Sequence, residues 1–115
     1  ALTWVQNMVA PSRLNDAALI EDIVQMFERK SEDIFQRQIK ALLERPDASD
    51  VLAEVQVPTL VMAGEFDAWA SPQQHQQIAD LVPTRPTVDV VMGSGHMMMM
   101  EKPELVTASF LSWLQ

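Results

Sequence analysis

The sequence has no cysteine and no long apolar run, and it contains few basic residues and only three glycines. Without cysteine the chain can form no disulfide, no thiolate nucleophile and no cysteine-type zinc site. No stretch approaches the roughly 18 consecutive apolar residues that a membrane helix needs. The start of the chain lacks the basic region of a signal peptide and an initiating methionine, so we expect a cytoplasmic protein cut from a longer chain.

The shortage of basic residues excludes a nucleic-acid partner. Sixteen acidic residues oppose eight basic ones, for a formal net charge of −8, and the basic residues are scattered along the sequence. Such a surface repels a phosphate backbone. An acidic excess of this kind is typical of a surface that keeps the protein in solution.

Metal and dinucleotide sites also lack their motifs. The chain has two widely separated histidines and no H-E-x-x-H sequence, so we expect no metal ion. The G-x-G-x-x-G fingerprint begins at Gly93 and Gly95 but has Met98 in place of its third glycine. We therefore expect no cofactor.

The first half of the chain is predicted to be helical. Residues 1–55 show the 3.6-residue periodicity of helices. Asn15 or Asp16 can cap one helix, and Ser31 can cap the next, which Pro46 ends. The apolar faces predicted for these two helices are Leu19, Ile20, Ile23, Val24 and Phe27 in the first, and Ile34, Phe35, Ile39, Leu42 and Leu43 in the second.

The second half, residues 56–115, alternates strand and helix. We predict strands over residues 57–63 and 87–92, and the first is apolar on both faces, as in a parallel sheet covered on both sides. Ser71 and Pro103 mark the starts of the helices that follow. The residues predicted to face the core are Ile78, Leu81 and Val82, and then Leu105, Val106, Phe110, Trp113 and Leu114. This order predicts an α/β fold with parallel strands.

Asp67 and His96 each lie just beyond a predicted strand. Open parallel sheets place their catalytic groups in the loops at the carboxyl ends of the strands. Taken singly, an aspartate there is more often a turn former and a histidine more often solvated. Matching positions on neighbouring strands favour a pair, in which the carboxylate accepts the Nδ1 proton and leaves Nε2 free as a base.

Two segments of the chain resemble the C-terminal part of α/β-hydrolase-fold enzymes. They are VPTLVMAGEFD at residues 57–67, followed by Ser71-Pro72, and GSGH at residues 93–96, followed by EKPE at 101–104. Both occur in the family's order and at its usual separation, with a terminal helix after them.

The resemblance implies a partial α/β-hydrolase fold and a division of labour within it. Asp67 would be the acid of a catalytic triad and His96 its general base. Residues 1–55 would be a helical, cap-like segment, and residues 56–115 the C-terminal part of the core.

The third member of the triad is absent from the sequence. The family's elbow, G-x-S-x-G, cannot be built from Gly64, Gly93 and Gly95, because Ser94 has its glycines immediately beside it. We expect the chain to be inactive alone and to be part of a hydrolase of an ester or related small molecule. A serine nucleophile would mean esterase-like chemistry and an aspartate epoxide- or halide-cleaving chemistry; the alternative is a non-catalytic ligand-binding or interaction module.

Three residues beside the pair are candidates for contact with a substrate. Trp69 follows Asp67 in its loop, and Met97 and Met98 follow His96; ordinary packing is the alternative for each. Two strands also leave two open sheet edges. We therefore expect a homo-oligomer, or association with the part of the fold that holds the nucleophile.

Overall fold

The structure, a computed structural model, describes residues 2–115. Along the chain it has the elements α1 (Leu2–Val5), η1 (Pro11–Arg13), α2 (Ala17–Glu28), α3 (Glu32–Leu43), α4 (Ser49–Ala53), β1 (Val61–Gly64), α5 (Pro72–Leu81), β2 (Val88–Val91), α6 (Met98–Glu101) and α7 (Pro103–Leu114). Strands and helices alternate in the second half, which confirms the predicted mixed α/β character with parallel strands.

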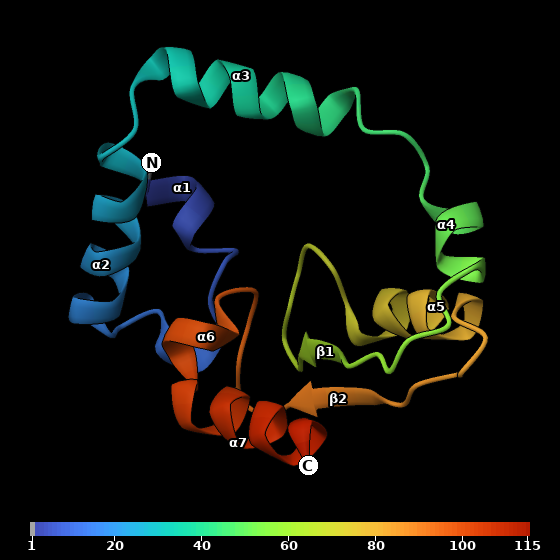
Figure 1. Ribbon diagram of the computed structural model, residues 1–115. Helices are drawn as coiled ribbons and strands as arrows, with labels where there is room; N and C mark the ends of the chain where they lie inside the picture. The colour runs from blue at the N-terminus through green and yellow to red at the C-terminus, as the bar shows by residue number, and fades with distance from the viewer. Residues whose placement is uncertain (1) are drawn as a thin grey trace.

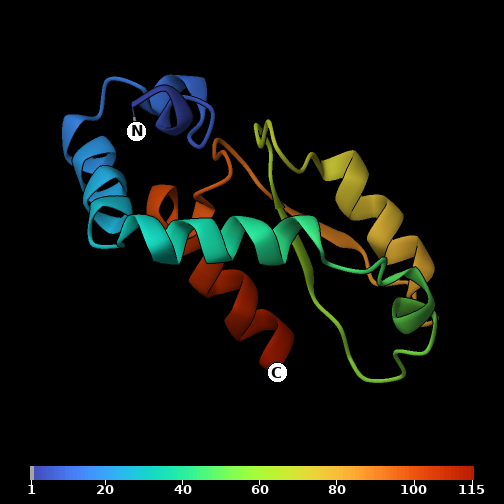
Figure 2. The same cartoon turned by 90° about the horizontal axis from the view of Figure 1, so that it is seen from above.

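The two strands form a parallel sheet between helices. Val61 pairs with Val88 and Gly64 with Val91, and all four residues of β1 are buried. Figures 1 and 2 show the strands between α5 and α7, which pack against them. Helical cover on two sides is what a strand that is apolar on both faces requires.

The first strand begins later than the sequence predicts. Residues 57–60 lie outside the sheet, and Val57 is 64% exposed. The strand starts at Val61 because its partner β2 begins at Val88, and because Pro58 has no N–H to give to a ladder. The second predicted strand, 87–92, is only one residue longer at each end than β2.

Side-chain caps start the helices where the sequence predicts them. Asp16, rather than Asn15, caps α2 by accepting the Leu19 N–H at 3.1 Å. The Ser31 hydroxyl caps α3 in the same way. Ser71 and Gln74 form a reciprocal capping box at the start of α5. These caps satisfy N–H groups that have no partner inside their helices.

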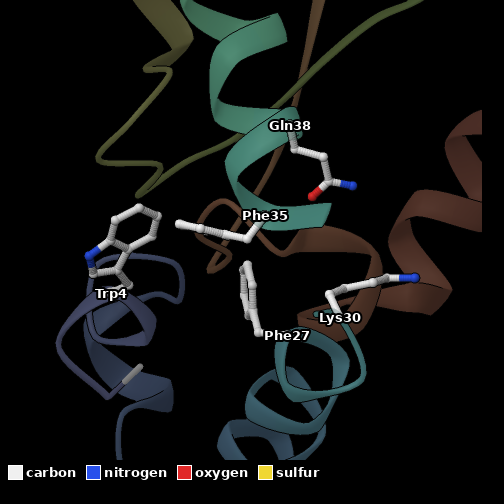
Figure 3. Close-up of a pocket in the computed structure, with 5 residues that line it drawn as sticks. All are labelled: Trp4, Phe27, Lys30, Phe35 and Gln38. Carbon is white, nitrogen blue, oxygen red and sulfur yellow. The ribbon is translucent and has the colours of Figure 1, made fainter. Parts of the chain in front are cut away.

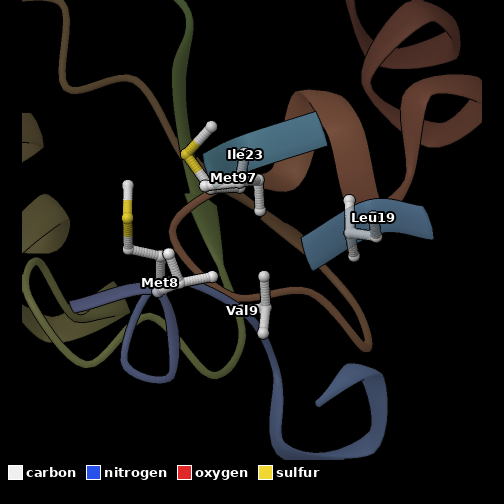
Figure 4. Close-up of a cluster of buried hydrophobic side chains, with 6 residues drawn as sticks. Met8, Val9, Leu19, Ile23 and Met97 are labelled. Carbon is white, nitrogen blue, oxygen red and sulfur yellow. The ribbon is translucent and has the colours of Figure 1, made fainter. Parts of the chain in front are cut away.

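The largest buried cluster joins the two halves of the sequence. It consists of Val5, Met8, Val9, Leu19, Ile23 and Met97. In Figure 4 the side chains of Met8, Ile23 and Met97 converge from the N-terminal segment, α2 and the segment after His96. The predicted apolar face of α2 is confirmed, because Ile20, Val24 and Phe27 pack around the same cluster.

Three other predicted apolar faces are less covered than expected. No residue of α3 is buried, and this helix lies apart from the sheet, between α2 and α4 (Figure 1). On α5, Ile78 and Leu81 are exposed while Val82 is buried; on α7 only Val106 is buried. The prediction that the apolar residues of α5 and α7 face the core was therefore wrong for most of them, whereas the predicted apolar face of α3 exists but is not covered within the described residues. The exposed residues of the three faces are Ile34, Phe35, Leu42, Leu43, Ile78, Leu81, Leu105, Phe110, Trp113 and Leu114.

Among residues 2–115, no helix combines the length and the apolar character needed to cross a membrane.

Candidate active site

Asp67 occupies the loop that leaves β1 and serves that loop in two ways. One carboxylate oxygen, Oδ1, accepts the backbone N–H groups of Trp69 at 2.8 Å and Ala70 at 2.9 Å. The other, Oδ2, lies 2.9 Å from Nδ1 of His96. The turn-forming role and the pairing with histidine, which the sequence posed as alternatives, therefore coexist in one side chain.

His96 lies in the loop that leaves β2, at the same edge of the sheet. Its side chain is 37% exposed, whereas that of Asp67 is 6% exposed. A carboxylate accepts but cannot donate, so Nδ1 must carry the shared proton when the ring is neutral. Nε2 is then the unprotonated nitrogen, which is the one a general base uses.

The environment of Asp67 favours its charged form. Burial by itself raises the pKa of this carboxyl group. The hydrogen bonds from the Ala70 N–H, from His96 and from the Trp69 N–H outweigh burial, and the net pKa lies below its usual value. Asp67 is therefore ionised at neutral pH and can stabilise a protonated His96 ring.

Backbone hydrogen bonds hold the two loops at a fixed separation. The Glu65 N–H donates to the Val91 carbonyl at 3.1 Å, and the Phe66 N–H donates to the Ser94 carbonyl at 2.8 Å. In return, the Gly93 N–H donates to the Glu65 carboxylate at 2.7 Å. The Asp67–His96 geometry is thus built into the backbone of both loops.

Two glycines allow these loops to come so close. A Cβ on Gly64 would collide with the carbonyl group of Gly95, so only glycine fits at the end of β1. Gly93 has a φ of +73°, a conformation that side chains disfavour. Their places in the sequence motif therefore have steric reasons.

Ser94 is not a nucleophile in this structure. It is fully buried, and its hydroxyl donates to the Val91 carbonyl at 2.8 Å. Within residues 2–115, the side chain of His96 has a hydrogen bond to Asp67 and none to a serine or threonine hydroxyl. The described part of the chain also contains no group of three His, Asp or Glu side chains that could hold a metal ion.

The candidate substrate-contacting residues lie in different surroundings. Trp69 is 43% exposed, and its ring centre is 4.9 Å from that of His96, so it forms a wall beside the imidazole ring. Met97 is buried in the N-terminal cluster, and Met98 packs toward Met62, Val91 and Val106. These positions support packing roles for both methionines; the structure brings only Trp69 to the pair.

A line of aromatic rings leads from His96 to a hollow that the sequence did not predict. The ring centre of Trp4 lies 6.4 Å from that of Trp69, edge to face, and 5.7 Å from that of Phe35. The hollow has a volume of about 350 Å³ and is lined by Trp4, Phe27, Lys30, Phe35 and Gln38. Figure 3 shows the three aromatic side chains gathered from α1, α2 and α3.

Besides the residues that line this hollow, sequence reasoning missed Glu101, which lies near the site. Its carboxylate is buried and accepts the N–H of Gly95, the residue before His96. Its only signal in the sequence is its place in the EKPE segment that follows the histidine motif.

Of the comparisons with known proteins, that with solved structures is informative. Neither a family model nor a curated protein matches the sequence. A solved structure of a thermophilic esterase from Thermogutta terrifontis, with malate bound, is similar to this chain with a TM-score of 0.89 and 32% sequence identity. The match covers 96% of this chain and 40% of the esterase chain. The chain therefore shares its fold with part of that esterase and spans about two fifths of its length.

Proposed function

We propose that the chain is the C-terminal part of an α/β-hydrolase-fold ester hydrolase and supplies the acid and the base of its catalytic triad. The observation that carries the proposal is the 2.9 Å contact between Oδ2 of Asp67 and Nδ1 of His96. The two residues follow adjacent parallel strands, in a fold similar to that of an esterase. Open α/β sheets place catalytic groups at this position.

In the proposed reaction His96 acts first as a general base, which accepts a proton, and then as a general acid, which gives it up. Its Nε2 takes the proton from a serine hydroxyl, supplied by the remaining part of the fold, as that oxygen attacks the ester carbonyl. It then gives the proton to the departing alcohol, which leaves an acyl-serine. His96 next takes a proton from water as the water attacks that acyl group, and returns it to the serine oxygen as the carboxylic acid departs. Asp67 fixes the tautomer and stabilises the imidazolium. With an aspartate nucleophile His96 would instead activate water; the similarity to an esterase favours serine.

The aromatic hollow suggests the kind of ester. Trp69 lies beside His96, and Trp4 connects it to the hollow between α1, α2 and α3. Apolar, aromatic walls of this kind bind aryl or alkyl groups. The proposed substrate is therefore an ester with an apolar acyl or alcohol group that reaches from the base toward Trp4.

The exposed apolar residues on α7 support association with a further part of the fold. Phe110, Trp113 and Leu114 are exposed, and the chain corresponds to 40% of the esterase that it resembles. We propose that the nucleophile-bearing part covers them and that, without it, a second copy of the chain does so. Light scattering of the chain alone should then report more than one chain per particle, and a stable monomer would contradict this.

The second candidate function is a non-catalytic binding or interaction module. It is favoured by one observation: within the described residues, Ser94 is the serine closest in sequence to His96, and its hydroxyl is buried against a carbonyl. The coding sequence upstream separates the two candidates, because a hydrolase needs an elbow with a nucleophile there.

The decisive experiment is an assay of the protein encoded together with any such upstream segment. We expect this protein to hydrolyse p-nitrophenyl butyrate. In His96→Ala the rate of hydrolysis should fall by about 10³-fold or more. His75→Ala is the matched control, because His75 lies on α5 and contacts the Ser71 carbonyl rather than an acid. Equal activity of His96→Ala and the unmodified protein, or the absence of an upstream elbow, would overturn the proposal.

A further inference from the structure

Glu101 has a buried carboxylate that the proposed mechanism does not use. The residue is 3% exposed and lies at the end of α6. Its Oε1 accepts the N–H of Ala10 at 2.7 Å, and its Oε2 accepts the N–H of Gly95 at 2.9 Å. One side chain therefore joins two backbone segments that are far apart in the sequence.

Hydrogen bonds satisfy the polar groups of Glu101 in its buried position. A buried carboxylate is costly unless hydrogen bonds and opposite charge compensate it. Here each oxygen has a backbone donor, and the guanidinium group of Arg13 donates to the backbone carbonyl of Glu101. Arg13 is itself held by Asp16 at 2.8 Å. The carboxylate is thus fixed by two backbone donors, and the backbone of Glu101 by Arg13.

The two segments that Glu101 joins also touch directly. A Cβ on Gly95 would lie 2.6 Å from the Val9 carbonyl carbon and 2.7 Å from the Ala10 nitrogen, so the backbones are already in contact. One residue beyond His96, the Met97 N–H donates to the Met8 carbonyl at 3.0 Å. His96 is therefore flanked on both sides by residues whose N–H groups are anchored.

We infer that Glu101 is a positioning residue for His96. By holding the Gly95 N–H against the segment Met8–Ala10, it sets the backbone from which the imidazole reaches Asp67. It contacts neither Asp67 nor a reacting atom, so it acts through the loop. Its effect on turnover rests on the proposed function, whereas its effect on the ring's tautomer does not.

The first test needs no substitution. The Ala10 and Gly95 amides share one acceptor group, so in the unmodified chain both should resist hydrogen exchange as strongly as the amides in the middle of α2. Exchange of either amide at the rate of an exposed loop would overturn the inference.

The second test is Glu101→Gln, read by ¹⁵N NMR of the His96 ring. The amide NH₂ of glutamine cannot accept, so one of the two backbone N–H groups loses its partner. We expect hydrogen exchange at Gly95 or Ala10 to accelerate about 5- to 100-fold, the range for a lost buried hydrogen bond. We also expect the share of the Nε2–H tautomer of His96 to rise severalfold.

Glu104→Gln is the matched control, because it makes the same chemical change on an exposed residue of α7. It should leave both readouts unchanged. Should Glu101→Gln fail to fold, Glu101→Asp takes its place, since it keeps the charge but reaches only one of the two donors. The same accelerated exchange and altered tautomer are then expected.

The outcomes separate a positioning role from a purely structural one. Faster exchange with an unchanged tautomer would show that Glu101 only stabilises the fold, and would overturn the inference. An altered tautomer without ester hydrolysis in the complete protein would support the inference while refuting the proposed function. An altered tautomer in Glu104→Gln as well would also overturn it.

Discussion

The histidine loop, residues 92–97, and helix α3 differ sharply in how the rest of the chain supports them. Within the loop Ser94 and Met97 are buried, and Gly95 contacts the backbone of Val9. Helix α3 has a strong apolar face and no buried residue. Buried contacts and long-range hydrogen bonds therefore concentrate at the edge of the sheet that carries Asp67 and His96. Helix α3 depends on its cap at Ser31 and on local ion pairs such as that between Arg37 and Asp33.

This difference indicates which part of the molecule must be rigid. Catalytic geometry tolerates little displacement, and a group fixed by backbone contacts needs no reorganisation during the reaction. A helix that covers a binding site can be held more loosely, because ligand access requires movement. The two regions should consequently respond to substitution on very different scales.

The largest effect is expected from Asp67→Asn in the complete protein, if it is the proposed hydrolase. Asparagine keeps an oxygen for the Trp69 and Ala70 N–H groups but turns an NH₂ toward Nδ1 of His96, which favours the wrong tautomer. We expect kcat to fall by about 10³- to 10⁴-fold. Asp80→Asn on the exposed face of α5 is the control and should leave kcat unchanged. A fall of less than tenfold in Asp67→Asn would mean that the pair is not used in catalysis.

The next effect concerns the close contact of the histidine loop with the N-terminal segment. Gly95→Ala inserts a methyl group into the backbone of Val9 and Ala10, and we expect a loss of about 1–3 kcal/mol or more in the free energy of unfolding. Gly93→Ala meets no backbone atom within 3.5 Å but has the unfavourable φ, so about 1–2 kcal/mol is expected. Urea unfolding measures both.

If Gly95→Ala proves the milder of the two, the loop is less tightly held than its contacts indicate. In Gly95→Ala the hydrogen exchange of Met97 should also accelerate, because its bond to Met8 lies beside the new methyl group.

The proximity of Asp67 and His96 could be predicted from the sequence because it depends on local patterns. Each follows a short apolar strand, and parallel strands end at the same edge of a sheet. The caps at Asp16, Ser31 and Ser71 were equally local. The catalytic roles of the pair stay predictions, as does the division of the chain at residue 55.

The parts that could not be predicted depend on partners distant in the sequence. The Glu101 carboxylate accepts a hydrogen bond from the N–H of Ala10, 91 residues away in the sequence. No pattern in the sequence near Glu101 predicts that donor. The start of β1 is set by where β2 begins rather than by the apolar run. Periodicity identified the apolar face of α3 correctly, but it cannot tell whether anything within the chain covers that face.

A smaller effect is expected when the Asp67–His96 contact is tested by pH. The folded-state pKa of Asp67 is lowered, so its contribution to stability is complete above its unfolded-state pKa, about 3.9, and is lost as the pH falls through the folded value. The stability difference between the unmodified chain and Asp67→Asn should thus be fully present at about pH 5 and shrink below about pH 4. Urea unfolding of both proteins at pH 7, 5 and 3 measures it. A difference that does not change over this range would contradict the favourable environment of the carboxylate.

The smallest effect is expected on helix α3, and it tests the other side of the comparison. Leu43 is 79% exposed at the end of the helix, so Leu43→Ser removes almost no buried apolar surface. We expect the free energy of unfolding of a single chain to change by less than about 0.5 kcal/mol. Leu19→Ser, on α2 in the largest buried cluster, provides the contrast and should destabilise the chain severely. If Leu43→Ser costs about as much as a buried substitution, then α3 is packed against something in solution, most simply a second copy of the chain. Dilution would distinguish that case, because the effect of Leu43→Ser should disappear as the associated copies separate.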